Sequence, residues 1–216
     1  MSAGRPSIVG DDAGPSPPYP LKMEGKVISG FGRGSKEASH PIPDAHGLGI
    51  PTANLPVDES TTPWIADAKS GVYFGYASLS HPPTPTTTSP SPDSSSHPPT
   101  ASFRIFPMVM SIGYNPFYKN TIRSAEVHIL HRFDADFYGS HMRLLILGYV
   151  REELDYTTLE ALVADINFDC EVARKSLARK GWAPRKGVVV KDGEGNGGEV
   201  ADVDGTLDVD WLVTPL

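Results

Sequence analysis

Apolar residues in this chain gather in short runs that glycine and proline separate. The runs richest in β-branched and aromatic residues, which are typical of strands, are Met23–Phe31, Gly71–Leu79, Phe103–Gly113, Ala125–His131 and Met142–Val150. Apolar and polar residues alternate in the fourth run, as in a half-buried strand. The fifth run is the most apolar, so we expect that strand to be buried on both faces.

One segment towards the C-terminus has helical spacing instead. Between Thr157 and Arg179, seven apolar residues form a stripe: Leu159, Leu162, Val163, Ile166, Cys170, Ala173 and Leu177. Thr157 and Glu160 have the spacing of a capping box, which predicts that the helix begins at Thr157. Several strands followed by one late helix predict a mainly β fold, a closed antiparallel barrel with a helix packed on it.

Three segments lie outside this pattern. Residues 1–20 are rich in glycine, serine and proline, which predicts a flexible N-terminal arm. Residues 81–100 are almost wholly proline, serine and threonine, so we expect a disordered loop between two strands. Residues 183–216 are interpreted as a C-terminal tail. The remaining chain, residues 21–182, is expected to form one domain.

Charge and cysteine content narrow the classes of function. A formal net charge of −7 argues against nucleic acid as a partner. The single cysteine, Cys170, excludes an intrachain disulfide and lies on the apolar stripe of the predicted helix. No apolar run reaches the length of a signal peptide or a membrane span. We therefore expect a cytoplasmic monomer without an integral membrane segment, and keep a mitochondrial location open.

The most informative stretch is Gly47–Asn54, which reads Gly-Leu-Gly-Ile-Pro-Thr-Ala-Asn. If it runs extended, Thr52 and Asn54 project their oxygen-bearing side chains from the same face. Two neutral oxygens suit a hard cation such as Mg²⁺, which also binds substrate phosphates. Taken alone, the stretch favours a simpler interpretation, a turn and a short strand in which both side chains satisfy local backbone groups.

A basic, glycine-rich loop precedes this stretch. Gly30–Lys36 reads Gly-Phe-Gly-Arg-Gly-Ser-Lys, and its amides and cations are suited to an anion. Its spacing fits neither a Walker A loop nor a dinucleotide-binding fingerprint. Together with Pro51–Asn54, the loop resembles the riboflavin kinase (flavokinase) family, in which a GxGRGSK loop leads into a PTAN motif. Residues 38–46 look like an insertion between the two.

The resemblance implies a six-stranded antiparallel Greek-key barrel with a C-terminal helix. It also implies a kinase that uses ATP to phosphorylate the ribityl 5′-hydroxyl of riboflavin, giving ADP and FMN, with Mg²⁺ held by Thr52 and Asn54. The residues that it places around ATP are Gly30, Lys36, Thr52, Asn54, Ile129, His131 and Tyr138, and those that it places around the flavin are Arg151, Leu154 and Tyr156.

Glu126 is the carboxylate that the resemblance assigns as the catalytic base. From the alternation alone, this residue is more simply interpreted as part of a solvated strand face. The runs Asn115–Thr121 and Ser124–Ile129, however, resemble the family segment that ends in the catalytic glutamate. Arg151 begins an Arg-Glu-Glu sequence where the family often has Arg-Pro-Glu, and without the resemblance it would be a surface cation.

The histidines do not form a zinc site by spacing. His128 and His131 are three apart on a predicted strand and face opposite ways, and the others lie in loops without a ligand pattern. We expect Mg²⁺ as the ion and keep Zn²⁺ as a second choice. The alternative function is a non-catalytic flavin- or nucleotide-binding β-barrel. A bifunctional FAD synthetase is disfavoured, because too little chain follows the helix for a second domain.

Overall fold

The computed structural model describes residues 4–28, 52–80, 104–114, 123–133, 137–185, 188–191, 199–202 and 204–214. The glycine loop at 30–36, the insertion at 38–46 and the loop at 81–100 lie outside these ranges. The predictions made for those segments therefore stay predictions.

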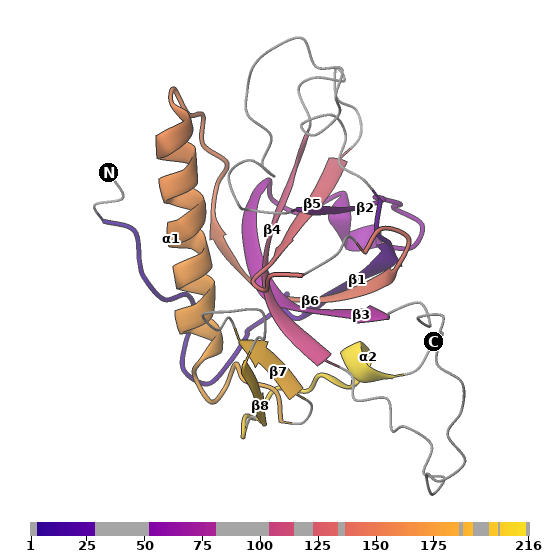
Figure 1. Cartoon of the computed structure of the whole chain (residues 1–216). Helices are drawn as coiled ribbons and strands as arrows, with labels where there is room; N and C mark the ends of the chain where they lie inside the picture. Colours follow the sequence, from indigo (N-terminus) through magenta and orange to yellow (C-terminus); the bar gives the residue numbers. More distant parts are fainter. Residues whose placement is uncertain are drawn as a thin grey trace, which may run out of the picture.

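Six antiparallel strands curl into a barrel (Figure 1). They are β1 (Leu21–Lys26), β2 (Ala53–Leu55), β3 (Gly71–Ser80), β4 (Arg104–Tyr114), β5 (Arg123–Ile129) and β6 (His141–Arg151), and they pair in the order β1-β6-β3-β4-β5-β2. The two ends of this row meet at one bridge, where Ile28 N–H donates to Asn54 O at 2.9 Å and Asn54 N–H donates to Ile28 O at 3.3 Å. This bridge brings the first strand against the second.

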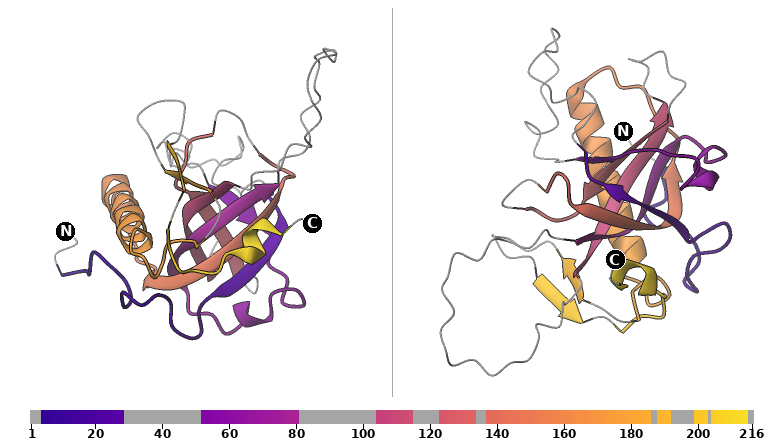
Figure 2. Two further views of the ribbon diagram at one scale, coloured as in Figure 1. Left: turned by 90° about the horizontal axis from the view of Figure 1, so that it is seen from below. Right: turned by 90° about the vertical axis from the view of Figure 1, so that its right-hand side faces the viewer.

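The predicted architecture is confirmed. β6, β3, β4 and β5 are neighbours in the order of a Greek key, and α1 (Leu159–Leu177) packs against the outside of the barrel (Figure 2). β6 is also buried on both faces as predicted. Leu144 and Ile146 point into the barrel, whereas Leu145 and Leu147 point towards the layer that contains α1.

Two apolar cores result from this arrangement. The core inside the barrel is built from alternating residues of every strand, among them Met108, Met110 and Val127. The second core lies between the barrel and α1, where the rings of Phe74 and Trp182 stack with centroids 5.5 Å apart. A three-residue 3₁₀ helix, Pro63–Ile65, adds Ile65 to the inner core.

The helix begins one residue later than its capping-box spacing predicted. Thr158 is the N-cap, and its Oγ1 accepts a hydrogen bond from Ala161 N–H at 3.2 Å. The prediction that Thr157 fills this role is therefore wrong. Because Thr157 and Thr158 are adjacent, sequence spacing alone could not decide which hydroxyl faces the first turn.

The N-terminal segment does not form the flexible arm that its composition predicted. Residues 5–12 contact α1 and the residues just after it, and the indigo trace in Figures 1 and 2 runs along the helix before it crosses to β1. The Val9 N–H donates to Ser176 Oγ at 3.0 Å, and Trp182 Nε1 donates to Asp11 O at 2.7 Å. Side chains in α1 and just after it thus supply hydrogen bonds to the backbone of this coil.

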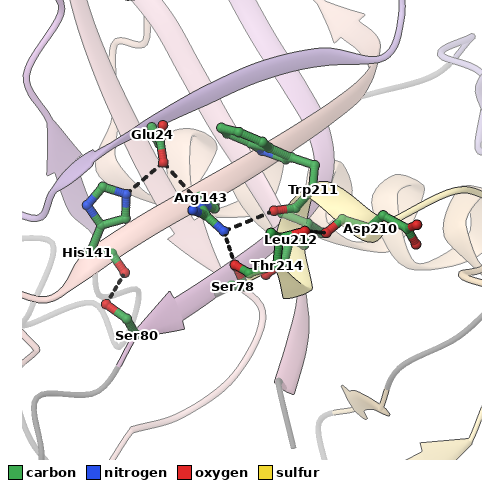
Figure 3. Close-up of polar contacts among 9 residues, drawn as sticks. All are labelled: Glu24, Ser78, Ser80, His141, Arg143, Asp210, Trp211, Leu212 and Thr214. Atoms are coloured by element: carbon green, nitrogen blue, oxygen red, sulfur yellow. Dashed lines mark hydrogen bonds and ion pairs between the residues drawn. The ribbon is translucent and has the colours of Figure 1, made fainter. Parts of the chain in front are cut away.

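The C-terminal residues also pack on the barrel. β7 (Val188–Lys191) pairs in parallel with β4 and forms a hairpin with β8 (Glu199–Asp202). α2 (Asp210–Val213) docks on β6 and β3, where Ser78 Oγ donates to Leu212 O at 2.8 Å and Arg143 Nη1 donates to Trp211 O at 3.2 Å (Figure 3). The described part of residues 183–216 therefore packs against the barrel. None of the described helices is long and apolar enough to cross a membrane.

Candidate active site

Thr52, Asn54 and Glu126 meet where β2 pairs with β5. Asn54 lies directly opposite Glu126 in the strand register, and Thr52 Oγ1 donates a hydrogen bond to Glu126 Oε1 at 2.8 Å. The neighbouring Ala53 and Val127 point into the barrel, so the three polar side chains share the outward face. The two motifs that the sequence pointed to, 74 residues apart, therefore form one polar cluster.

The barrel's closure holds this cluster in place. Asn54 is only 6% exposed, and its backbone is paired with Ile28 on one side and with Glu126 on the other. Ile28 lies two residues before the glycine loop at 30–36. Asn54 therefore lies between Ile28, the last described residue before that loop, and Glu126.

Two residues predicted around ATP, His131 and Tyr138, lie between the end of β5 and the start of β6. The rings of Phe106, His131, Phe133 and Phe137 contact one another, with centroids 4.7 to 5.3 Å apart. Tyr138 is 46% exposed, and the next residue, Gly139, donates to Val27 O at 2.9 Å. This turn therefore lies beside the strand end that reaches Asn54.

Ile129 can take part only through its backbone. Its side chain is 3% exposed inside the barrel, and its carbonyl accepts the His131 N–H at 2.7 Å. Gly30 and Lys36, the two remaining residues predicted around ATP, lie outside the described ranges.

The segment predicted to contact the flavin follows β6 and returns towards β4. A Cβ atom on Gly113 would lie 2.1 Å from Glu153 Oε1, which shows how closely this segment approaches the strand. Gly113 is two residues from Ser111, the β4 partner of Glu126. Leu154 is 50% exposed in this segment. The structure thus brings the predicted flavin side next to the predicted catalytic side along β4.

Arg151 and Tyr156 are both tied to α1. Arg151 donates to the Asp169 carboxylate from Nε at 3.1 and 2.9 Å, and its Nη2 lies 2.7 Å from Asp169 Oδ2. Tyr156 Oη donates to Asp165 Oδ2 at 2.9 Å. The interpretation of Arg151 as a plain surface cation is therefore wrong, because its guanidinium is fixed by a buried carboxylate.

Comparisons with known proteins identify the family. A family model described as "Flavokinase: Riboflavin kinase" matches residues 17–177. The chain belongs to the riboflavin kinase family. A riboflavin kinase of Pyricularia oryzae is 58% identical over 219 residues, covering 100% of this chain and 97% of that protein. One of Neurospora crassa is 48% identical, with coverages of 97% and 96%. The crystal structure of riboflavin kinase from Trypanosoma brucei has a TM-score of 0.50 and 26% identity, covering 75% of this chain and 82% of that chain.

The polar cluster has oxygen donors that suit a hard divalent ion. Thr52 and Asn54 offer neutral oxygens, and Glu126 adds carboxylate oxygens beside them. Mg²⁺ prefers such ligands and takes the rest from water and substrate phosphates. Among the described residues, no group of three His, Cys, Asp or Glu side chains could hold a metal by itself. The donor set therefore suits Mg²⁺ and gives no support to Zn²⁺, which favours nitrogen and sulfur ligands.

Sequence reasoning missed the residues behind the predicted flavin side. Asp165 and Asp169 are four apart on α1, and Arg5 reaches both from the N-terminal segment. A signal was present: Asp169 falls between Ile166 and Cys170 of the apolar stripe, where a charge needs a partner. The identity of that partner could not be predicted, because Arg5 is 164 residues away.

Proposed function

We propose that this protein is a riboflavin kinase, which transfers the γ-phosphoryl group of ATP to the ribityl 5′-hydroxyl of riboflavin and releases ADP and FMN. Membership of the family supports the reaction. One observation supports the assignment of residues: the hydrogen bond from Thr52 to Glu126, which joins the PTAN motif to the expected base. Phosphoryl transfer needs held phosphates and a placed hydroxyl more than covalent chemistry, and the proposal assigns these tasks to this cluster and the residues around it.

Glu126 is the base in this proposal. As the ribityl oxygen forms its bond to the γ-phosphorus, the hydroxyl proton passes to a Glu126 carboxylate oxygen, and the bond between the γ-phosphorus and the β–γ bridging oxygen breaks. Thr52 donates its hydroxyl hydrogen to Oε1 and so orients the carboxylate, and the proposal assigns the proton to the second carboxylate oxygen.

Thr52 and Asn54 are the proposed Mg²⁺ ligands. Because the Thr52 hydroxyl gives its hydrogen to Glu126, its lone pairs are left for an ion. Mg²⁺, when bound, neutralises charge on the β- and γ-phosphates of ATP. Gly30, Lys36, the Ile129 backbone, His131 and Tyr138 are proposed to line the ATP side, and Arg151, Leu154 and Tyr156 the flavin side.

The test is incubation of the protein with riboflavin and Mg-ATP, followed by separation of the flavins. We expect a new phosphorylated flavin that forms in step with ADP, and none when ATP is left out or Mg²⁺ is chelated. Binding of riboflavin without release of ADP would favour the alternative, a non-catalytic flavin-binding barrel.

A further inference from the structure

Five side chains from three parts of the molecule form a charge-paired group on α1, which we term the α1 charge cluster: Arg5, Arg151, Tyr156, Asp165 and Asp169. Asp169 accepts hydrogen bonds from both Arg5 and Arg151. Arg5 Nη1 also lies 3.1 Å from Asp165 Oδ2, the oxygen that accepts from Tyr156. Arg5 thus bridges the two carboxylates that hold Arg151 and Tyr156.

The α1 charge cluster is balanced and mostly buried. Two arginines face two aspartates, and the side chain of Asp169 is 3% exposed. A buried carboxylate needs such partners, since an unpaired charge away from water is strongly unfavourable. The Arg5 guanidinium also lies over the Phe168 ring, 4.7 Å from its centroid. Arg5 is therefore fixed by α1 on two sides and is not a freely moving cation.

Arg5 is delivered by a segment that is itself docked. Arg179, just beyond α1, donates to Val9 O and to Gly10 O, the latter at 2.9 Å, and lies 3.0 Å from the Asp12 carboxylate. These contacts hold the chain a few residues after Arg5. The position of Arg5 therefore does not depend on the α1 charge cluster alone.

We propose that Arg5, acting through Asp165 and Asp169, positions Arg151 and Tyr156 for the flavin, so that the N-terminal segment is part of the riboflavin site. This inference rests on the proposed function, in which Arg151 and Tyr156 contact riboflavin. Arg5, Asp165 and Asp169 are positioning residues: they do not touch the substrate but set the orientation of the side chains that do.

The chemistry of the two flavin-side residues fits this role. Arg151 ends β6, and the coil after it, residues 152–156, has no strand partner among the described residues. The Asp169 carboxylate pairs with Nε and Nη2 of Arg151. The third guanidinium nitrogen of Arg151, Nη1, donates to Glu152 O at 2.9 Å. Burial, followed by the hydrogen bond to Asp165, raises the pKa of Tyr156 to about 12, so its hydroxyl remains a donor.

The test compares Arg5→Met and Arg5→Lys with the same substitution at an exposed site, Arg185→Met, which removes only surface ion pairs with Asp208 and Asp210. In the Arg5→Met variant, we expect the Kd for riboflavin, measured by flavin fluorescence, and its KM to rise about three- to tenfold, because Arg151 must be ordered during binding. The kcat and the KM for ATP should stay within about twofold. Lysine, a point charge that cannot fork to both carboxylates, should restore only part of the affinity.

A role in stability alone would give a different result. It would lower the Tm of Arg5→Met while leaving the riboflavin Kd and KM at the values of wild type and Arg185→Met, and that result would overturn the inference. A wild-type protein that forms no phosphorylated flavin would overturn the proposed function, and this inference with it. As a second variant, Asp165→Ala, which removes the acceptor of the Tyr156 hydroxyl, should raise the riboflavin Kd in the same direction.

Discussion

Two carboxylates of this protein, Glu126 and Asp169, are held in opposite ways. Among the described residues, Glu126 has one hydrogen-bond donor, the neutral hydroxyl of Thr52. Asp169 is 2% exposed and accepts from the guanidinium groups of Arg5 and Arg151. A carboxylate with free lone pairs can accept a proton from a substrate, whereas one surrounded by cationic donors can only fix the groups around it. Local bonding thus distinguishes the carboxylate that is proposed as the base from the one that is proposed to position other side chains.

Replacing Glu126 should have the largest effect on turnover. Glu126→Gln keeps an acceptor for the Thr52 hydroxyl, so the fold and riboflavin binding should persist, but an amide cannot take the hydroxyl proton. We expect kcat to fall about 10²- to 10⁴-fold, the usual contribution of a positioned base. Steady-state kinetics and flavin binding check this, with Glu59→Gln, an exposed acid after β2, as the matched control. Near-normal turnover in Glu126→Gln would remove the base assignment and with it the contrast between the two carboxylates.

Replacing Asp169 should have the largest effect on stability. Asp169→Asn is nearly isosteric but leaves two guanidinium groups without their shared charge. Breaking a buried ion pair from one side costs about 3–5 kcal/mol, so the free energy of unfolding should fall by that amount. Denaturant unfolding measures it. The control is Glu171→Gln on the same helix, which removes an exposed pair with Lys175 and should cost at most about 0.5 kcal/mol. Equal losses of unfolding free energy in the two variants would contradict the view that Asp169 is held by its two arginine partners.

Replacing Thr52 should weaken catalysis by an intermediate factor. Thr52→Val keeps the shape but removes the donor to Glu126 and one proposed ion ligand. A hydrogen bond to a charged group contributes about 1.5–3 kcal/mol, so kcat/KM for ATP should fall roughly 10- to 100-fold. Thr52→Ser, which retains the hydroxyl, should recover most of the loss. If serine and valine behaved alike, the hydroxyl would have no part in the site.

Sequence patterns predicted the elements whose structure depends mainly on residues close to one another in the chain. Strand runs with period-two alternation and one helical stripe were enough for the barrel and α1, because each pattern is set by which side of an element faces a core. The cluster of Thr52, Asn54 and Glu126 was reached through two motifs that resemble a family. Periodicity alone predicts only that Glu126 is a solvated residue of a strand.

The parts that could not be predicted depend on contacts between distant segments. Residues 4–20 have no periodicity, and the position of residues 5–12 beside α1 and the residues after it is set by single contacts such as Arg5 with Asp169. α2 has four residues, too few for a helical period, and it is placed by Ser78 and Arg143 of the barrel. Composition rich in proline, glycine and serine correctly indicates the absence of regular structure, but it does not indicate the absence of fixed contacts.

The smallest effect is expected at a third carboxylate, Glu24 (Figure 3). Its bonding is intermediate between that of Glu126 and that of Asp169. Partial burial opposes its ionisation, but hydrogen bonds from His141 at 2.8 Å and Arg143 at 3.0 Å outweigh it and hold the pKa of Glu24 below its ordinary value. A lowered pKa in the folded state means that the ionised group adds stability above the ordinary pKa, near 4.3, and that this is lost as the pH falls through the folded value.

The Tm difference between wild type and Glu24→Gln should therefore be constant near neutral pH and should disappear below about pH 4. The difference itself should be small, because the Glu24 side chain is 39% exposed and solvent screens its partners. Thermal unfolding of both proteins across this pH range measures it, with Glu59→Gln as the control for an acid in an exposed turn. A Tm difference that persisted at low pH would mean that the Glu24 side chain contributes by packing and not by charge. A loss of stability as large as that of Asp169→Asn would mean that Glu24 is as firmly paired as Asp169.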